Sequence, residues 1–191
     1  MKTIRSFVRS GLLAGACLMS SAALAGPFAD AATGAEAKAT EDPVAAMEAA
    51  QNAFADFAES LRFTIANTTF IGEPAAGFGM ITPREAKFKP GEPLVVYAEP
   101  VGLHWKEGGR GYQSQFTVDV DLLSPDGKVL GGQKDFGKFG FDSEIRNQEI
   151  MSTLTLNLDG VPPGDYVVRY TFHDVVSGAS ADTELPFTVA E

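Results

Sequence analysis

The stretch from Gly160 to Glu191 constrains the fold of this chain more than any other part. It opens with the corner Pro162-Pro163-Gly164, after which bulky side chains occupy every second position: Tyr166, Val168, Tyr170 and Phe172. A Ser-Gly turn separates this run from a second alternating run with Leu185, Phe187 and Val189. Alternation with a period of two is typical of β-strands that bury one face. The stretch therefore predicts a terminal β-hairpin, which needs further strands to cover it.

Five earlier segments show similar strand signals, and Gly or Pro marks most of their limits. They are residues 63–71, 94–101, 116–123, 128–133 and 150–158. Residues 135–144, DFGKFGFDSE, are interpreted as a glycine-rich connection. No helical pattern lies between the segments. About seven closely spaced strands predict an antiparallel, two-sheet β-sandwich over residues 63–191.

One amphipathic helix is expected before the sandwich, over residues 42–62. Asp42 suits the N-cap and Pro43 the first helical position. Apolar side chains then recur at three- and four-residue spacing and form one stripe: Val44, Met47, Ala50, Phe54, Phe57, Ala58 and Leu61. The expected partner-binding face consists of Val44, Met47, Phe54, Phe57 and Leu61. What covers the stripe stays open: the sandwich, a second copy of the helix or another protein.

Residues 1–25 have the features of a secretory signal peptide. Basic side chains without acidic ones precede an apolar run at residues 11–24, and Ala23-Leu24-Ala25 fits a cleavage site before Gly26. The run is shorter than the ~20 residues that span a bilayer, so no membrane span is expected after cleavage. Residues 26–41 are rich in alanine and lack an apolar period, which predicts a mobile leader.

Cys17, the single cysteine, lies inside the signal segment. Residues 13–17 resemble a bacterial lipobox, so lipidation at Cys17 stays open as an alternative to cleavage before Gly26. Cleavage there leaves no thiol, which excludes disulfides, thiolate catalysis and cysteine metal sites. The segment as a whole predicts a periplasmic or secreted protein.

The charge of the chain limits its partners. The net charge is −10, from 15 Lys and Arg against 25 Asp and Glu. Cleavage before Gly26 removes three basic residues and no acidic one, which leaves 12 against 25 and a net charge of −13. A surface of this sign repels phosphate backbones and anionic lipids. Nucleic acid is therefore not an expected partner.

The corner Pro162-Pro163-Gly164 followed by Tyr166 resembles the tyrosine corner of immunoglobulin-like and fibronectin type III-like domains. The resemblance covers the strand pattern from Phe63 to Val189, although the antibody cysteine pair is absent and Trp105 precedes the third strong strand. The ending PPG-x-Y, D-x-x-SG and LPFTV is similar to modules of uncharacterised exported bacterial proteins. The resemblance implies a mainly β, immunoglobulin-like sandwich of about seven strands and an envelope location. It implies no activity.

The sequence carries no enzyme motif that we can identify, so a protein without catalytic activity, cofactor or metal is expected. The two histidines, His104 and His173, do not lie in a metal-spaced pair or beside a G-x-S-x-G serine. His173 falls on the outward phase of its strand, where a solvated side chain is expected. Asp119 and Asp121 share a strand face, and calcium binding with a third oxygen donor is an alternative there.

One loop carries a candidate ligand site. Its residues are His104, Trp105, Arg110 and Tyr112. An aromatic ring beside an arginine and a histidine can stack on a sugar or anchor a protein partner. The alternative is that Trp105 belongs to the core and the loop is a solvated tip.

These observations predict an exported, non-catalytic binding or scaffolding protein of the bacterial cell envelope. The helix or a sheet edge would contact a protein partner, and a homo-oligomer formed through the helix is one version of this hypothesis. The alternative is a carbohydrate-binding module, in which the aromatic loop around Trp105 and Tyr112 stacks on a glycan.

Overall fold

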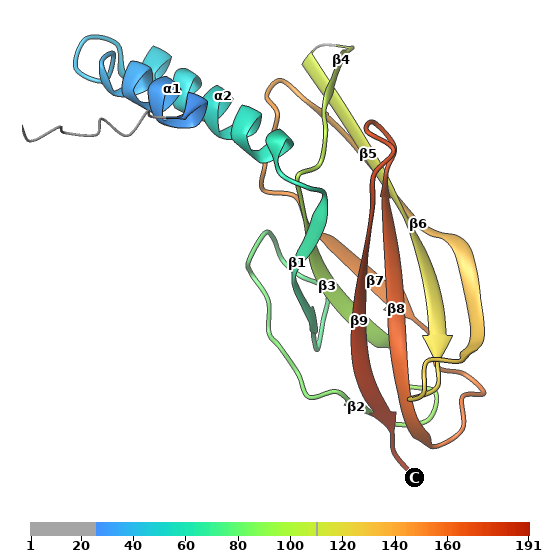
Figure 1. The fold of residues 1–191 in the computed structure, drawn as a ribbon. Coiled ribbons are helices and arrows are strands. Elements are labelled where there is room, and N and C mark those ends of the chain that lie inside the picture. Colours follow the sequence, from blue (N-terminus) through green and yellow to red (C-terminus); the bar gives the residue numbers. More distant parts are fainter. Residues whose placement is uncertain (1–25, 110) are drawn as a thin grey trace, which may run out of the picture.

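The computed structural model describes residues 26–109 and 111–191 and is mainly β (Figure 1). The predicted signal segment and Cys17 lie outside the described residues. Within these residues, two helices, α1 (Pro27–Glu36) and α2 (Pro43–Ser60), precede nine strands. The strands are β1 (Thr64–Phe70), β2 (Lys87–Phe88), β3 (Leu94–Val101), β4 (Lys106–Gly108), β5 (Gly111–Leu123), β6 (Val129–Ser143), β7 (Ser152–Leu156), β8 (Gly164–Asp174) and β9 (Ser180–Val189). None of the helices in this part of the chain is long and apolar enough to cross a membrane.

The strands form two sheets that enclose one core. The smaller sheet has the order β1-β3-β7, and the larger has the order β2-β9-β8-β5-β4, with β6 also paired to β5. Pairings are antiparallel except that β2 runs parallel to β9. The larger sheet curls, so that the two sheets together have the form of half a barrel (Figure 1).

The predicted fold class is therefore confirmed as mainly β, but its details need correction. The strand count exceeds seven within the described residues because β2 and β4 are two and three residues long. Elements of that length are too short to show an alternating pattern. The architecture is also not a regular sandwich, because a curled sheet and one parallel pair replace two flat antiparallel sheets.

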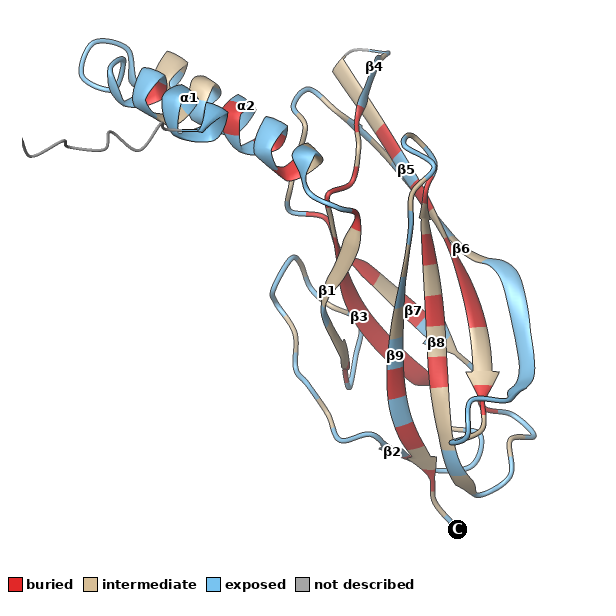
Figure 2. Ribbon diagram, in the orientation of Figure 1, coloured by how far each residue is buried: buried red, intermediate tan, exposed pale blue. Residues whose placement is uncertain are grey.

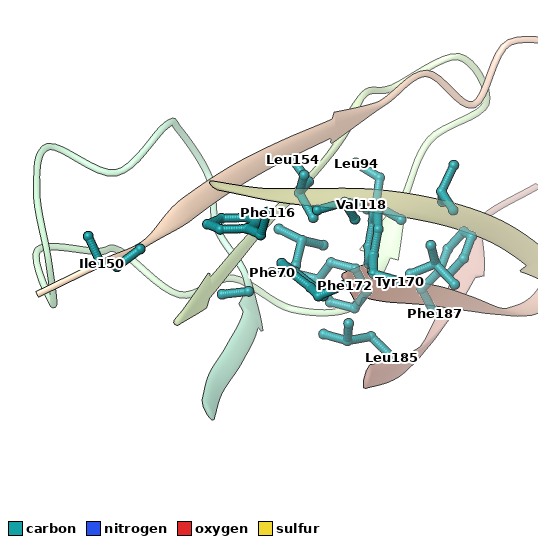
Figure 3. Close-up of a cluster of buried hydrophobic side chains, with 14 of the residues drawn as sticks. Phe70, Leu94, Phe116, Val118, Ile150, Leu154, Tyr170, Phe172, Leu185 and Phe187 are labelled. Carbon is teal, nitrogen blue, oxygen red and sulfur yellow. The ribbon is translucent and has the colours of Figure 1, made fainter. Parts of the chain in front are cut away.

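The core lies between the sheets and contains mostly aromatic and branched side chains (Figures 2 and 3). Phe116 of β5 lies near Phe172 of β8, with ring centroids 5.8 Å apart. Strand β3 is buried from Leu94 to Pro100, because residues beyond β1 cover its second face and Ile71, Val95 and Tyr97 form a small cluster there. This agrees with the apolar character of β3 on both faces.

Strand β6 corrects the prediction of a glycine-rich connection at residues 135–144. The strand continues to Ser143, and Phe139 and Phe141 stack on Phe116 at centroid distances of 4.8 and 5.9 Å. The register with β5 shifts near Asp135, which has a φ of 52°. That bulge and the glycines interrupt the alternation, which explains why the sequence pattern was misread.

Helix α1 corrects the prediction of a mobile leader at residues 26–41. The helix begins at Pro27, which occupies its first turn, and alanines supply a high intrinsic helix propensity. Phe28 stacks on Phe57 of α2 with centroids 4.8 Å apart, and Ala35 is buried. The two helices form a helical hairpin (residues 27–60) that projects from one end of the β domain (residues 63–191) (Figure 1).

A side-chain hydrogen bond closes the corner before β8. The Tyr166 hydroxyl donates to the carbonyl oxygen of Pro162 over 2.9 Å. Gly164 opens β8 with a φ of 156°, a conformation that residues with a side chain rarely adopt. The bond ties the entrance of β8 to the preceding turn.

Candidate functional site

Helix α2 carries the predicted partner-binding face, and its start follows the sequence signals closely. The Asp42 side chain accepts a hydrogen bond from the backbone N–H of Ala45 over 3.0 Å, and Pro43 is the first helical residue. The helix ends at Ser60 rather than at residue 62. Its 18 residues span about 27 Å.

Helix α2 buries small residues rather than large ones. Its buried residues are Ala53, Ala55 and Ala58. Ala53 lines a groove together with Phe28 and Ala31 of α1. The larger apolar side chains of α2 remain on its surface.

The five residues of the predicted face all remain exposed, and we call them the exposed face of α2. Their exposed fractions are 69% for Val44, 61% for Met47, 50% for Phe54, 40% for Phe57 and 38% for Leu61. The possibility that the β domain of the same chain covers the stripe is therefore wrong. Single exposed apolar residues are ordinary, but a row of five along one helix is a typical feature of an interaction surface.

A groove of about 360 Å³ runs beside this face, between the beginning of α1 and the end of α2. Its lining includes Phe28, Ala31, Ala53 and Phe57, and the surface is largely apolar. An apolar side chain of a bound protein fits the chemistry of this groove.

Arg146 attaches the hairpin to the β domain. Its guanidinium lies 2.7 Å from Asp56 and 3.7 Å from Glu59, and it donates to the carbonyl oxygen of Asn52 over 3.4 Å. Burial lowers the pKa of Arg146, but the hydrogen bond to Asp56 and the negative charges of Asp56 and Glu59 together outweigh burial and raise the pKa above its ordinary value. These contacts direct two acidic side chains of α2 toward the β domain.

The aromatic loop does not offer the stacking platform that the carbohydrate hypothesis requires. Trp105 is only 8% exposed and belongs to the core, with Phe141 at a centroid distance of 6.3 Å. Tyr112 is half-buried, and the Arg146 guanidinium lies 5.8 Å from the centre of its ring. Arg110 lies outside the described residues. The alternative interpretation, that Trp105 belongs to the core, agrees with this burial.

His104 is half-buried and takes part in a local hydrogen-bond network. Its backbone N–H donates to Asp174 over 3.1 Å, and its Nδ1 lies 3.1 Å from the carbonyl oxygen of Gly102. The Asp174 side chain is fully buried and also accepts a bond from the backbone N–H of Val176. The network fixes the segment before β4 against the β8–β9 turn, and this is a structural role.

A polar cavity of about 420 Å³ lies at the tip of β4 and β5. Gln113, Asp142 and Glu144 are among the residues that line it, and the Gln113 amide donates to Asp142 over 3.0 Å. Its lining is polar rather than aromatic. A sugar bound there would be held by hydrogen bonds without ring stacking, so the cavity does not restore the predicted platform.

The outer face of the larger sheet holds a hydrogen-bonded cluster that the sequence pattern did not indicate. His173 Nε2 lies 2.9 Å from Asp119 Oδ2, and His173 Nδ1 lies 2.8 Å from the Ser180 hydroxyl. Lys134 donates to the same Asp119 oxygen over 2.8 Å. His173 is thus on the predicted outward face, but it is half-buried and bonded. Cross-strand register brings these residues together, and register is not visible in single segments.

Asp119 is fully engaged in this cluster. Burial raises its pKa, but the hydrogen bonds from Lys134 and His173, with the backbone N–H of Asp135, lower the pKa to about 2. Within the described part of the chain, no three His, Cys, Asp or Glu side chains converge as metal ligands do. Neither His173 nor Ser180 lines a cavity described above.

Comparisons with known proteins give no family for this chain. No family model matches the sequence, and no curated protein matches it. Solved structures with a similar course of the chain exist, and the three described next are distant in sequence.

Three of these structures illustrate the distance. The sporulation control protein Spo0M of Bacillus subtilis is 11% identical, with a TM-score of 0.39 over 69% of this chain and 50% of that chain. The PKD domain of an M14-like peptidase from the Thermoplasmatales archaeon SCGC AB-540-F20 is 12% identical, with a TM-score of 0.38. The match covers 68% of this chain and 96% of that domain. A superoxide reductase (neelaredoxin) from Ignicoccus hospitalis is 17% identical, with a TM-score of 0.32. The match covers 55% of this chain and 75% of the reductase chain. The chain spans half the length of Spo0M.

The prediction that the protein is not an enzyme is contradicted by this comparison. The similar structures include an enzyme, the superoxide reductase. The missing sequence motifs therefore do not exclude catalysis. The low TM-scores do not transfer an activity to this chain either.

Proposed function

We propose that this protein is an exported binding or scaffolding protein of the bacterial cell envelope, and that the exposed face of α2 is its protein-binding surface. One observation carries the proposal. Val44, Met47, Phe54, Phe57 and Leu61 lie in one row and stay exposed although the β domain has a closed core of its own. Keeping such a row in water is unfavourable by roughly 25 cal/mol per Å² of apolar area, and a bound protein removes that cost.

The location in the envelope is supported by residues 1–25, which have the sequence features of a secretory signal. The acidic composition supports a protein partner over nucleic acid or an anionic lipid surface. Residues 26–62, which contain the hairpin, carry seven acidic and two basic side chains. A basic headgroup-binding helix has the opposite composition.

We further propose that the β domain is immunoglobulin-like and serves as a rigid base for the hairpin. The hydrogen bond from Tyr166 to Pro162 supports this interpretation, since a tyrosine corner is a recurrent feature of such domains. Two sheets around an aromatic core agree with it. Arg146 then holds α2 to that base.

The proposal is tested by photo-crosslinking in cells that export the protein. A photoreactive phenylalanine analogue replaces Ala50, which lies on the exposed side of α2, or Leu130, which is 50% exposed on β6. We expect a protein adduct at Ala50 and little at Leu130. Cell fractionation of the same strain should place the protein outside the cytoplasm with Gly26 as its first residue.

Two results would contradict the proposal. Equal crosslinking at both positions would mean that α2 has no special affinity for protein. Retention of the chain in the cytoplasm would remove the envelope location, whatever the crosslinks.

A further inference from the structure

The apolar residues of α2 follow the spacing of a coiled-coil seam. Met47, Ala50, Phe54, Phe57 and Leu61 are separated by three, four, three and four residues, and all five are exposed. We call this set the seam of α2. Spacing that alternates between three and four places side chains along the line where two helices interdigitate. The geometry therefore calls for another helix, rather than a loop or a sheet, as the occupant.

The residues beside the seam are uncharged. Ala46, Gln51, Ala53 and Ala58 flank it, and Phe28 of α1 stacks on Phe57 at one end. The positions that flank a seam normally choose the partner through opposite charges. A strongly basic helix would find no acidic side chain at these positions. An equally acidic chain can approach without close like-charge contacts.

We infer that the helix that covers the seam belongs to a second copy of this chain. This inference rests on the proposed function and names its protein partner. Two hairpins pack with their α2 helices antiparallel, and the four helices form a bundle. The two β domains then lie at opposite ends of the bundle, which makes the dimer a scaffold with two separated binding modules.

The size pattern of the seam favours the antiparallel arrangement. A two-fold axis near residue 52 places the small Ala50 opposite Phe54 of the second copy, and Met47 opposite Phe57. Large side chains then face small or flexible ones, which allows close packing. Parallel pairing would instead place Ala50 against Ala50 and Phe54 against Phe54. The groove beside Phe57 gives the flexible Met47 of the second copy a place to insert.

The area indicates a dimer of modest strength. Half-exposed side chains of this size offer on the order of 500 Å² of apolar surface per copy, so a two-fold contact removes about 1,000 Å² in total. That value is at the lower end for a specific interface. The dimer should therefore dissociate on dilution rather than persist at every concentration.

Sedimentation equilibrium of the exported protein tests the inference. We expect a monomer–dimer equilibrium, weakened by about tenfold or more in Phe54→Glu, because a charge replaces a ring that the dimer buries. Leu130→Glu is the matched control, because Leu130 is also 50% exposed but lies on β6. Met47→Glu provides a second seam variant, and circular dichroism verifies that each variant is folded.

Mixed disulfide formation tests the orientation. In a Cys17→Ser background, Ala50→Cys and Phe54→Cys proteins are oxidised separately and as an equal mixture. The antiparallel arrangement predicts that disulfides between the two different variants dominate in the mixture. Dominance of disulfides between identical variants would contradict the antiparallel dimer.

The outcomes separate this inference from the proposed function. A monomer at every concentration, or a dimer that Phe54→Glu and Met47→Glu leave unchanged, overturns the second copy as occupant. If the Ala50 photo-adduct then contains a different protein, the proposed function stands while the inference fails. If no adduct forms at Ala50, both are contradicted.

Discussion

The β domain and the helical hairpin differ in where they place phenylalanine. Phe116 and Phe172 of the β domain are fully buried, whereas Phe54 and Phe57 of the hairpin keep 50% and 40% of their surface exposed. Both regions are regular, and both bury apolar side chains, but the hairpin buries alanines. The difference indicates that the β domain is complete by itself. The hairpin keeps apolar surface that the rest of the described chain does not cover.

The largest expected effect compares one phenylalanine from each region. Phe172→Ala should lower the free energy of unfolding by about 3–5 kcal/mol, because it leaves a cavity in a closed core. Phe54→Ala should change it by less than about 1 kcal/mol in dilute protein, because the ring is half in water. Urea denaturation of both variants measures the two values. Similar losses would mean that the regions do not differ.

A smaller effect is expected from the polar cluster on the outer face of the β domain. The pKa of Asp119 falls from 3.8 to about 2 in the folded protein. The ionised carboxylate therefore stabilises the fold at pH values above the pKa of the unfolded chain. That contribution, on the order of 2 kcal/mol, is lost as the pH falls from about 4 toward 2. Asp119→Asn should therefore be less stable than wild type at neutral pH, and the difference should vanish near pH 2.

The control for this prediction is Asp182→Asn, on an exposed position of β9. Its stability should follow that of wild type across the same pH range. A constant difference between Asp119→Asn and wild type down to pH 2 would show that the carboxylate charge has no part in the stabilisation.

The tyrosine corner should contribute about 1 kcal/mol, the usual net value of one hydrogen bond. Tyr166→Phe removes the hydroxyl that donates to Pro162 and leaves the ring in place. Guanidinium unfolding of this variant should give a lower midpoint with an unchanged slope. An unchanged midpoint would mean that water replaces the bond without loss.

The smallest global effect is expected at the junction of the two regions. Arg146→Ala removes the ion pairs with Asp56 and Glu59. The free energy of unfolding of the β domain should change by no more than about 1 kcal/mol, because the nearer partner, Asp56, is 71% exposed and an ion pair with an exposed carboxylate contributes little. Hydrogen exchange in the second half of α2 should become faster. Unchanged exchange would mean that α2 is not held through Arg146.

The elements that a sequence predicts best are those with long, uninterrupted patterns. The position of strand β3 is predicted well, because Leu94 to Ala98 form a continuous apolar run, although the strand continues through Pro100 to Val101. The cap at Asp42 and the apolar row of α2 were visible for the same reason. The prediction that this row forms a partner-binding face remains a prediction, although its residues are exposed.

The errors arose where the local signal was weak or interrupted. Helix α1 was read as a mobile leader because its contacts with α2, such as the stacking of Phe28 on Phe57, depend on tertiary structure. The bulge at Asp135 concealed the second half of β6. Burial of Trp105 against Phe141 requires that same strand, which explains why the candidate glycan platform was placed on a core residue.

Thiol labelling of an exposed and a buried alanine of α2 tests most directly whether this helix presents an uncovered apolar face. Ala50 is exposed and Ala53 is 5% exposed, although they lie three residues apart on the same helix. In a Cys17→Ser background and dilute protein, Ala50→Cys should react with a maleimide much faster than Ala53→Cys. At high concentration, dimer formation should slow the reaction of Ala50→Cys. Equal rates for both variants in dilute protein would contradict the claim that α2 presents an uncovered apolar face.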